Sequence, residues 1–149
     1  MIKAFFHFFI FFIFVFITDQ SLKKLFIDGF RWDGEYISLI LVYNKGVAFS
    51  MLSFLEGHLK HIQLLLFLAI SVYLLFHKDI FKKYAIPIGM IYGAGLSNVY
   101  DRFIYGGVVD YIYWHKWFDF AVFNFADVII DISVGLILLI TYLGKKEEV

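Results

Sequence analysis

Acidic residues stand inside or beside long apolar stretches at five places in this sequence of 149 residues: Asp19, Asp101, Asp110, Asp127 and Asp131. A charged side chain at the centre of a bilayer costs about 2.5 to 3.5 kcal/mol on insertion scales, so each of these acids needs a function or a partner. Two carboxyl groups held close together share one proton, and the neutral group then donates while the ionised one accepts. Such a pair can activate one water molecule for hydrolysis.

The elements that must position these acids are blocks of apolar residues. The chain is 62% hydrophobic and 22% aromatic, with a mean hydropathy of +0.80, well above the usage of soluble domains. We predict an all-α membrane protein with a single membrane-embedded domain over residues 1–149. Its four transmembrane helices are expected at residues 4–23, 59–76, 84–104 and 122–143.

The segment 30–55, between the first two apolar blocks, is too polar to cross lipid. Within it, Tyr36–Tyr43 is rich in β-branched and aromatic residues, Asn44-Lys45-Gly46 has turn chemistry, and apolar character resumes at Val47–Leu52. We therefore predict a small extracytoplasmic β-hairpin or sheet between the first and second helices, at the membrane surface.

The distribution of lysines predicts the orientation of the chain. Lys78, Lys82 and Lys83 crowd the short connection between the second and third blocks, which marks that connection as cytoplasmic. Four crossings then place both termini in the cytoplasm and gather the acids other than Asp131 toward the extracytoplasmic face. If the last helix begins near Val122, Asp127 lies about one and a half turns inside it.

Several classes of function and site are disfavoured by composition. The absence of cysteine excludes thiol catalysis, disulfides and cysteine metal sites. Thirteen basic residues balance thirteen acidic ones without a long basic run, so nucleic acid is not an expected partner. The five histidines are dispersed, and neither a metal nor another cofactor is expected. A cleaved signal peptide at the N-terminus is a weaker alternative, because no small-x-small cleavage site follows the first block.

Five short motifs, in this order, resemble those of the lipoprotein signal peptidase family, also called signal peptidase II. They are Asp19-Gln20-Ser21-Leu22-Lys23, Asn44-Lys45-Gly46-Val47-Ala48-Phe49-Ser50, Asn98-Val99-Tyr100-Asp101-Arg102, Val108-Val109-Asp110-Tyr111 and Phe123-Asn124-Phe125-Ala126-Asp127. The resemblance implies a membrane aspartic endopeptidase with Asp110 and Asp127 as the catalytic pair. Its substrate would be a diacylglyceryl-modified bacterial prolipoprotein surrounded by membrane lipids, cut just before the lipidated cysteine.

The resemblance also suggests roles for residues around the acids. It implies that four polar residues hold the substrate backbone or order the site: Asn44, Asn98, Arg102 and Asn124. It assigns structural support to Asp19, Lys23 and Asp101. Loop-stabilising hydrogen bonds and helix capping are alternative roles for all of these residues.

Two positions depart from the family pattern, and three other functions stay open. Leu22 stands where a small hydroxyl residue is more usual, and Asp131 adds an acid one turn after Asp127. Asp131 either raises the pKa of its neighbour or, as we expect, forms a hydrogen bond within the bundle. A Ser/Lys peptidase using Ser21 and Lys23 is disfavoured, since residues two apart do not face each other on a helix. A proton or cation transporter and a structural membrane subunit are the non-enzymatic alternatives.

Overall fold

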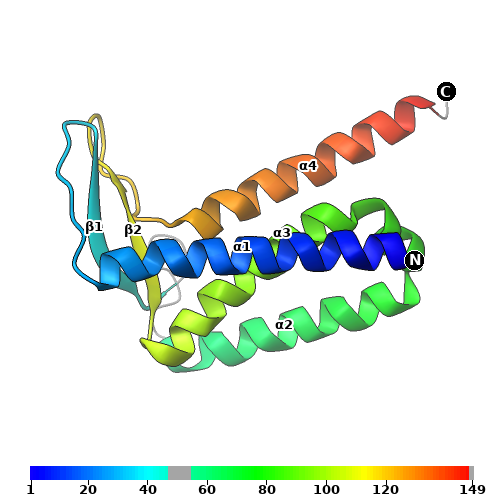
Figure 1. The fold of residues 1–149 in the computed structure, drawn as a ribbon, viewed down its shortest axis with the longest axis horizontal. Coiled ribbons are helices and arrows are strands. Elements are labelled where there is room, and N and C mark those ends of the chain that lie inside the picture. Colours follow the sequence, from blue (N-terminus) through cyan, green and yellow to red (C-terminus); the bar gives the residue numbers. More distant parts are fainter. Residues whose placement is uncertain (47–54, 148–149) are drawn as a thin grey trace.

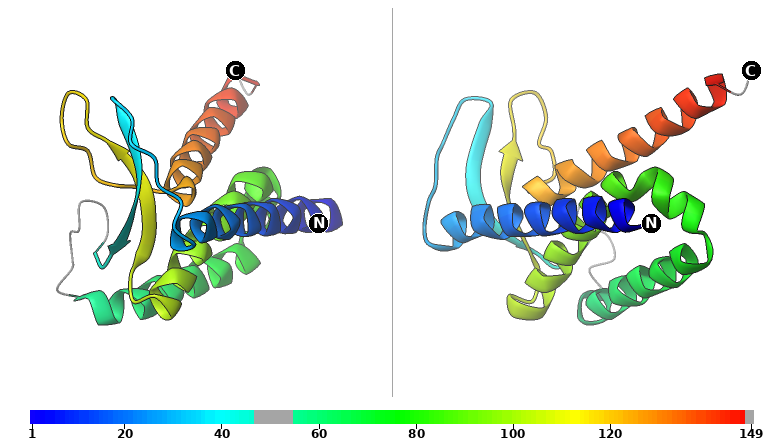
Figure 2. Two further views of the ribbon diagram at one scale, coloured as in Figure 1. Left: turned by 60° about the vertical axis from the view of Figure 1, so that its left-hand side comes forward. Right: turned by 45° about the vertical axis from the view of Figure 1, so that its right-hand side comes forward.

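The computed structural model describes residues 1–46 and 55–147. Its elements in chain order are α1 (Ile2–Ile27), β1 (Ile37–Asn44), α2 (Glu56–Phe76), α3 (Lys78–Ile104), β2 (Val108–Trp114) and α4 (Phe125–Glu147). The helices run along the long axis of the molecule, the sheet lies across one end, and both termini lie at the other end (Figure 1). Two further views show the same separation of the sheet from the termini (Figure 2).

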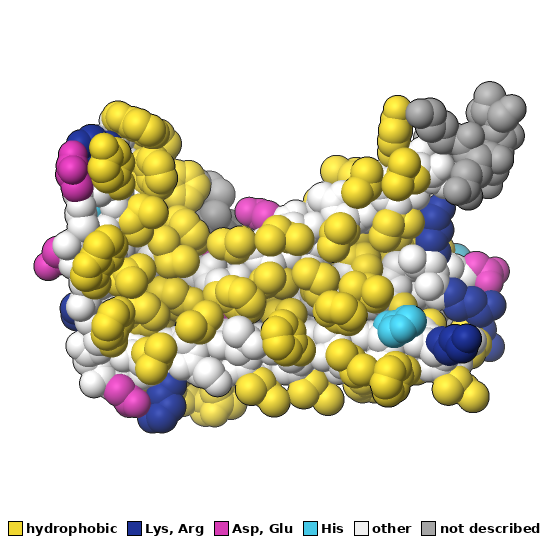
Figure 3. All heavy atoms as spheres, turned by 45° about the horizontal axis from the view of Figure 1, so that its top comes forward, with side chains coloured by type: hydrophobic (Ala, Val, Ile, Leu, Met, Phe, Trp, Pro, Cys, Tyr) yellow, Lys and Arg dark blue, Asp and Glu magenta, His cyan; other side chains and the backbone are white. Residues whose placement is uncertain are grey.

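Three of the described helices are long and apolar enough to cross a membrane, namely those over Ile2–Ile27, Gly57–Phe76 and Phe125–Gly144. Their outer faces carry large apolar side chains, as in Phe6, Leu65 and Leu138, which are 63%, 64% and 65% exposed. Figure 3 shows this apolar surface extending along the bundle. A surface of this kind is stable against lipid tails and unstable against water.

The helix α3 differs from the other three because protein surrounds much of it. It contacts α1, α2 and α4, and it buries polar side chains that include Ser97, Asn98 and Asp101. A helix that supplies polar groups to the interior has a lower mean hydropathy than one that faces lipid. This position explains why α3, expected as the span 84–104, is not among the three apolar windows.

Glycines allow α1 and α3 to approach closely. A Cβ built on Gly89 would collide with the backbone oxygen of Phe8, and one built on Gly93 would collide with that of Phe12. Small residues at such crossings let two helix backbones meet in a membrane. The first half of α1, which is almost entirely phenylalanine and isoleucine, is thereby held against α3.

The predicted connection around Lys78–Lys83 is itself helical, which corrects the expected start of the third helix. The helix α3 begins at Lys78, and the residue at its kink, Tyr84, has φ −115° and ψ 21°. Pro87 lies three residues further on. Its ring crowds the carbonyl group of the preceding turn, and because proline has no backbone N–H, that carbonyl receives no helical hydrogen bond from it. Proline therefore bends the chain here without ending the helix.

The sheet is antiparallel and joins two loops that lie far apart in the sequence. Its strand β1 falls within the predicted β-rich segment, which confirms that part of the prediction, but β1 pairs with β2, which follows α3. A hairpin lying wholly between the first two helices is therefore the wrong pairing for Ile37–Asn44. The second half of the predicted hairpin, Val47–Leu52, lies outside the described residues.

A one-residue bulge in β1 decides which face of the sheet each side chain occupies. Leu39 pairs with Ile112, whereas the next pair in the register joins Val42 to Asp110. In the uninterrupted register Asp110 would face Leu41, and Asn44 would point to the opposite face. The extra residue places Asn44 on the same face as Asp110, one diagonal step away.

The last helix begins three residues later than expected. The prediction placed its start near Val122, with Asp127 one and a half turns inside, but α4 begins at Phe125. Asp127 therefore lies in the first turn of α4, where free backbone N–H groups stabilise negative charge.

Candidate active site

The structure brings all nine residues singled out from the motifs into one hydrogen-bonded network at the sheet end of the bundle. The connections run through five different elements and involve Asp19, Lys23, Asn44, Asn98, Asp101, Arg102, Asp110, Asn124 and Asp127. Most of these side chains are buried, and Asp19, Lys23, Asp101 and Asn124 have no exposed surface. Buried polar groups of this kind are stable only when each finds a partner.

Asp110, the third residue of β2, is held by two amide groups. Nδ2 of Asn44 donates to its Oδ2 at 3.0 Å, and Nδ2 of Asn124 donates to its Oδ1 at 2.7 Å. Only 2% of the residue is exposed. Burial, followed by the nearby charge of Asp127, raises the pKa of Asp110 from the usual 3.8 to about 7. This carboxyl group is therefore partly protonated at neutral pH.

Asp127 and Asn124 form a reciprocal cap at the start of α4. The backbone N–H of Asp127 donates to Oδ1 of Asn124 at 3.0 Å, and that of Asn124 donates to Oδ2 of Asp127 at 3.1 Å. This is the capping-box arrangement, with the acid at the third helical position. The other oxygen of Asp127 accepts from Nδ2 of Asn98 at 3.0 Å.

Asn124 is consequently the residue that joins the two carboxyl groups. Its side-chain nitrogen contacts Asp110, while its backbone nitrogen contacts Asp127. The same side-chain nitrogen also lies 3.1 Å from Oδ1 of Asn98. Because the donors come from rigid elements, the relative position of the two acids is fixed by the fold.

Lys23 lies behind this pair and balances two other buried acids. Its Nζ is 2.6 Å from Oδ2 of Asp19 and 2.6 Å from Oδ2 of Asp101, and it donates to Oδ1 of Asn98 at 2.7 Å. Lys23 and both acids are almost completely inaccessible. A buried ion pair needs additional hydrogen bonds to offset desolvation, and here each acid has them.

The two acids bound to Lys23 also accept backbone N–H groups from the residues directly before Asp127 and Asp110. Oδ1 of Asp19 accepts the N–H of Ala126 at 2.9 Å, directly before Asp127. Oδ2 of Asp101 accepts the N–H of Val109 at 3.1 Å, directly before Asp110. A single cation in α1 thus ties the start of α4 to the start of β2.

Arg102 binds the end of β1. Its guanidinium donates to the carbonyl oxygen of Asn44 at 3.4 Å and also to that of Gly46. Both acceptors are backbone carbonyl oxygens. The fixed fork of the guanidinium holds the turn that positions the Asn44 side chain.

A cavity of about 470 Å³ opens beside Asp110 and Asp127. Figure 3 shows acidic side-chain atoms in the hollow where the sheet end of the molecule meets α4. The described residues lining the cavity combine apolar walls with a few polar groups, as is typical of a ligand pocket. They are Asn44, Gln63, Asn98, Arg102, Val108, Asp110, Phe120, Ala121, Val122, Phe123, Asp127, Val128, Ile130 and Asp131.

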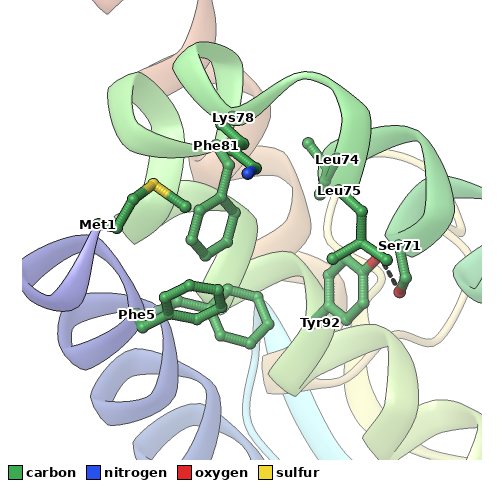
Figure 4. A pocket seen from close by; sticks show the side chains of 9 residues that line it. Met1, Phe5, Ser71, Leu74, Leu75, Lys78, Phe81 and Tyr92 are labelled. Carbon is green, nitrogen blue, oxygen red and sulfur yellow. Dashed lines mark hydrogen bonds between the residues drawn. The ribbon is translucent and has the colours of Figure 1, made fainter.

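Another cavity, of about 380 Å³, lies at the opposite end between α1, α2 and α3 (Figure 4). Its lining is mainly apolar, and its polar members include Ser71 and Tyr92, whose hydroxyl groups are 2.9 Å apart. Of the described residues that line it, none is acidic. The pair of carboxyl groups that lines the first cavity thus has no counterpart among the described residues of this one.

Three residues of the site were not singled out from the sequence. Nε2 of Gln20 donates to Oγ of Ser97 at 2.8 Å and to Oδ1 of Asp101 at 2.8 Å. The hydroxyl of Tyr111 accepts the N–H of Phe125 at 3.1 Å. Ser97 lies four residues before Asp101, so helical spacing alone puts them on one face and gives a signal that the sequence already contained.

Two other sequence expectations have clear outcomes. Ser21 is exposed, whereas Lys23 is buried between acids, so the arrangement of a Ser/Lys peptidase is not present. Asp131 is exposed along the cavity wall, and no hydrogen bond to it is found among the described residues, contrary to the expected bond within the bundle.

Comparison with solved structures defines the class of protein. A structure described as a bacterial membrane enzyme superposes with a TM-score of 0.70 at 25% identity, covering 93% of this chain and 87% of its own. A second one so described gives a TM-score of 0.68 at 24% identity, covering 87% and 88%. The fold is therefore that of a bacterial membrane enzyme with several apolar helices.

The sequence comparisons then identify the family. A family model described as signal peptidase (SPase) II matches residues 11–143. The lipoprotein signal peptidase of Helicobacter pylori (strain Shi470) is 51% identical over 146 residues, covering 98% of this chain and 93% of its own. That of Sulfurimonas denitrificans is 56% identical over 131 residues, covering 88% and 84%.

The chain therefore belongs to the signal peptidase II family, which confirms the resemblance drawn from the five motifs. Its function is that of an aspartic lipoprotein signal peptidase, and membership implies prolipoprotein substrates.

Proposed function

We propose that this single-domain protein cuts diacylglyceryl-modified prolipoproteins directly before the lipidated cysteine, with Asp110 and Asp127 as its catalytic pair. The observation that carries the proposal is the position of Asn124, which contacts both carboxyl groups. Both acids line one cavity of a size suited to a short length of extended peptide. The membership of the family supplies the substrate class.

The two carboxyl groups share one proton in this mechanism. The ionised member takes a proton from water, while the protonated member donates a hydrogen bond to the scissile carbonyl oxygen and polarises it. Water attacks the carbonyl carbon directly, and no acyl-enzyme forms. The pair titrates as one unit, so either carboxyl group can begin as the base.

The tetrahedral intermediate then collapses to products. The proton taken from water passes to the departing amine, and the C–N bond breaks to release a signal peptide with a free carboxyl group. The pair ends the cycle with a single proton, as it began. The four neutral amide contacts to the acids hold their orientation throughout.

We propose four membrane crossings, with α3 as the protein-enclosed third span and with both termini in the cytoplasm. Lysines at the end where α1 begins and α3 starts, among them Lys3, Lys78 and Lys82, support this orientation in a bacterial inner membrane. The sheet, Asp110 and the first turn of α4 are then extracytoplasmic. This position suits a peptidase that acts on substrates already exported.

The test is cleavage of a synthetic diacylglyceryl-modified prolipoprotein by the purified protein in detergent. Asp110→Asn and Asp127→Asn are each expected to lower kcat/KM by about three orders of magnitude or more, since the pair acts as a unit. The matched control is Asp28→Asn, an exposed acid that pairs with Lys24 at the same end of the molecule. Rapid cleavage by both dyad variants would overturn the catalytic assignment.

A second comparison tests the substrate class. The same peptide without the diacylglyceryl group is expected to be cut far more slowly, because it lacks the lipid that anchors it beside the cavity. Equal cleavage rates for both peptides would refute recognition of the diacylglyceryl group, but they would not contradict Asp110 and Asp127 as the catalytic pair.

A further inference from the structure

Two polar residues line the cavity beside Asp110 and Asp127 without belonging to the nine-residue network. They are Gln63 of α2 and Asp131 of α4. Both stand within helical segments that are apolar and long enough to cross a membrane, Gly57–Phe76 and Phe125–Gly144. Polar side chains at such depth are costly unless they have a partner, so these two need a reason for being there.

Gln63 has an unmet hydrogen-bonding group. Its Oε1 is buried and finds no hydrogen-bond partner among the described residues. A buried acceptor without a donor is destabilising, and a donor from a bound ligand would relieve this cost. The amide turns easily about its last side-chain bond, so either its oxygen or its nitrogen can face the cavity.

Both side chains lie deeper along their helices than the catalytic pair. Asp131 follows Asp127 by four residues in α4, which places it about 6 Å along the axis on the same face. Gln63 lies seven residues after the first residue of α2, about 10 Å from the start of that helix. The cavity therefore has a polar group on each of two walls on the side toward the middle of the bundle.

A peptide cut at this site places strong demands on such groups. The scissile segment must be extended to reach the two acids, and its freed backbone N–H and C=O groups are costly in hydrocarbon unless they are bound. In the proposed function the signal peptide precedes the scissile bond and lies in the membrane. Its last residues consequently occupy the deeper part of the cavity.

We propose that Gln63 and Asp131 form a subsite that binds the backbone of the signal peptide directly before the scissile bond. This inference rests on the proposed function. The Gln63 amide accepts one backbone N–H from the α2 side of the cavity, and the Asp131 carboxyl group accepts another from the α4 side. Both are positioning residues, because the hydrolytic chemistry belongs to Asp110 and Asp127.

The experiment uses full-length protein and diacylglyceryl-modified peptides in which single backbone amides before the scissile bond are replaced by esters, which lack the N–H. In wild type, an ester at a bound position is expected to raise KM about tenfold with little change in kcat, as loss of one hydrogen bond predicts. With Gln63→Met or Asp131→Leu, the all-amide peptide already shows the higher KM. In each variant, the ester at the position that the replaced side chain would bind is then expected to raise KM by less than about twofold further.

Control variants separate binding from helix packing. Ser71→Ala removes another polar side chain of α2 and its contact with Tyr92, and Asp79→Asn removes an exposed acid at the far end of the molecule. Both are expected to keep the full ester penalty of wild type. Asp131→Asn retains an acceptor oxygen, so the ester is expected to raise KM in this variant nearly as much as in wild type, unlike in Asp131→Leu.

The outcomes distinguish this subsite from the proposed function. If wild type cuts the all-amide peptide and the ester penalties are the same in wild type, Gln63→Met and Asp131→Leu, the subsite is overturned and the proposed function stands. If wild type fails to cut the all-amide peptide, the proposed function falls, and the subsite falls with it.

Discussion

Nδ2 of Asn124 donates to Oδ1 of Asp110 across 2.7 Å, which joins the residue that caps α4 to the third residue of β2. The same residue caps the helix that carries Asp127. Helix capping and alignment of the acids are thus two properties of one side chain, and substitutions that keep one property while removing the other separate them.

Asn124→Ser is expected to retain the cap of α4, and with it part of the stability that Asn124→Ala loses, but to lose activity. A serine hydroxyl accepts the N–H of the third helical residue, as Oδ1 of Asn124 does, but it cannot replace the amide donor to Asp110. Asn124→Ala loses both contacts, and the missing cap alone lowers the free energy of unfolding by about 1 kcal/mol. Thermal unfolding and kcat/KM measured on both variants test this. Equal activity of Asn124→Ser and wild type would contradict it.

The pH dependence of cleavage is expected to reflect the proton on the acid pair. The pKa of Asp110 is raised to about 7, first by burial and then by the charge of Asp127. As pH rises through this value, the remaining proton leaves and no donor is left for the scissile carbonyl. We expect kcat/KM to fall about tenfold per unit above roughly pH 7, since that parameter reports groups of the free enzyme. A flat profile up to pH 9 would argue against a shared proton.

Asp110→Asn is expected to lose less stability than wild type between pH 5 and pH 8. A carboxyl group whose folded-state pKa is raised contributes stability fully below its unfolded value of about 3.9, and that contribution is lost as pH rises through the folded value of about 7. The neutral amide removes this loss. The difference in Tm, Asp110→Asn minus wild type, is expected to be several degrees more positive at pH 8 than at pH 5. A difference independent of pH would contradict the shift.

Lys23→Met is expected to destabilise the protein severely. Removing the cation leaves Asp19 and Asp101 buried with no counter-charge, a change that costs about 3 to 5 kcal/mol. Adding Asp101→Asn should recover part of the loss, because one uncompensated acid is then gone. The matched control is Lys24→Met, which removes an exposed lysine whose side chain is 73% accessible. Thermal unfolding of these variants is the measurement, and similar Tm values for Lys23→Met and Lys24→Met would refute the role of Lys23.

The helices and most of the site could be predicted from the sequence, because lipid tolerates few alternatives. An acid in an apolar block must face protein, and this constraint alone draws attention to Asp19, Asp101 and Asp127. The start of α4 was also readable, since Asn124 and Asp127 have the spacing of a capping box that excludes a start near Val122. The apolar run before Asn124 gives a competing signal, which favours an earlier start of the helix.

The pairing of the sheet had no comparable local signal. The strand β1 has the composition of a strand, but its partner β2 begins more than sixty residues later, in a segment whose sequence indicates a family motif and not a strand. The bulge near Leu39 also escaped prediction, because a register shift depends on the partner strand. The partner of Asn44 therefore became apparent only in the folded molecule.

The pairing of β1 with β2 has a consequence for synthesis of the protein. A chain leaving the ribosome presents Asn44 early, whereas Asp110 and Asp127 follow only after the second and third helices have been made. The segment made first contributes Asn44, and the segments made later contribute both carboxyl groups and Asn124, so neither part alone contains the acids together with all of their amide contacts. A chain that ends before Asp127 lacks one carboxyl group of the proposed pair, so we expect it to be inactive until the start of α4 has been made.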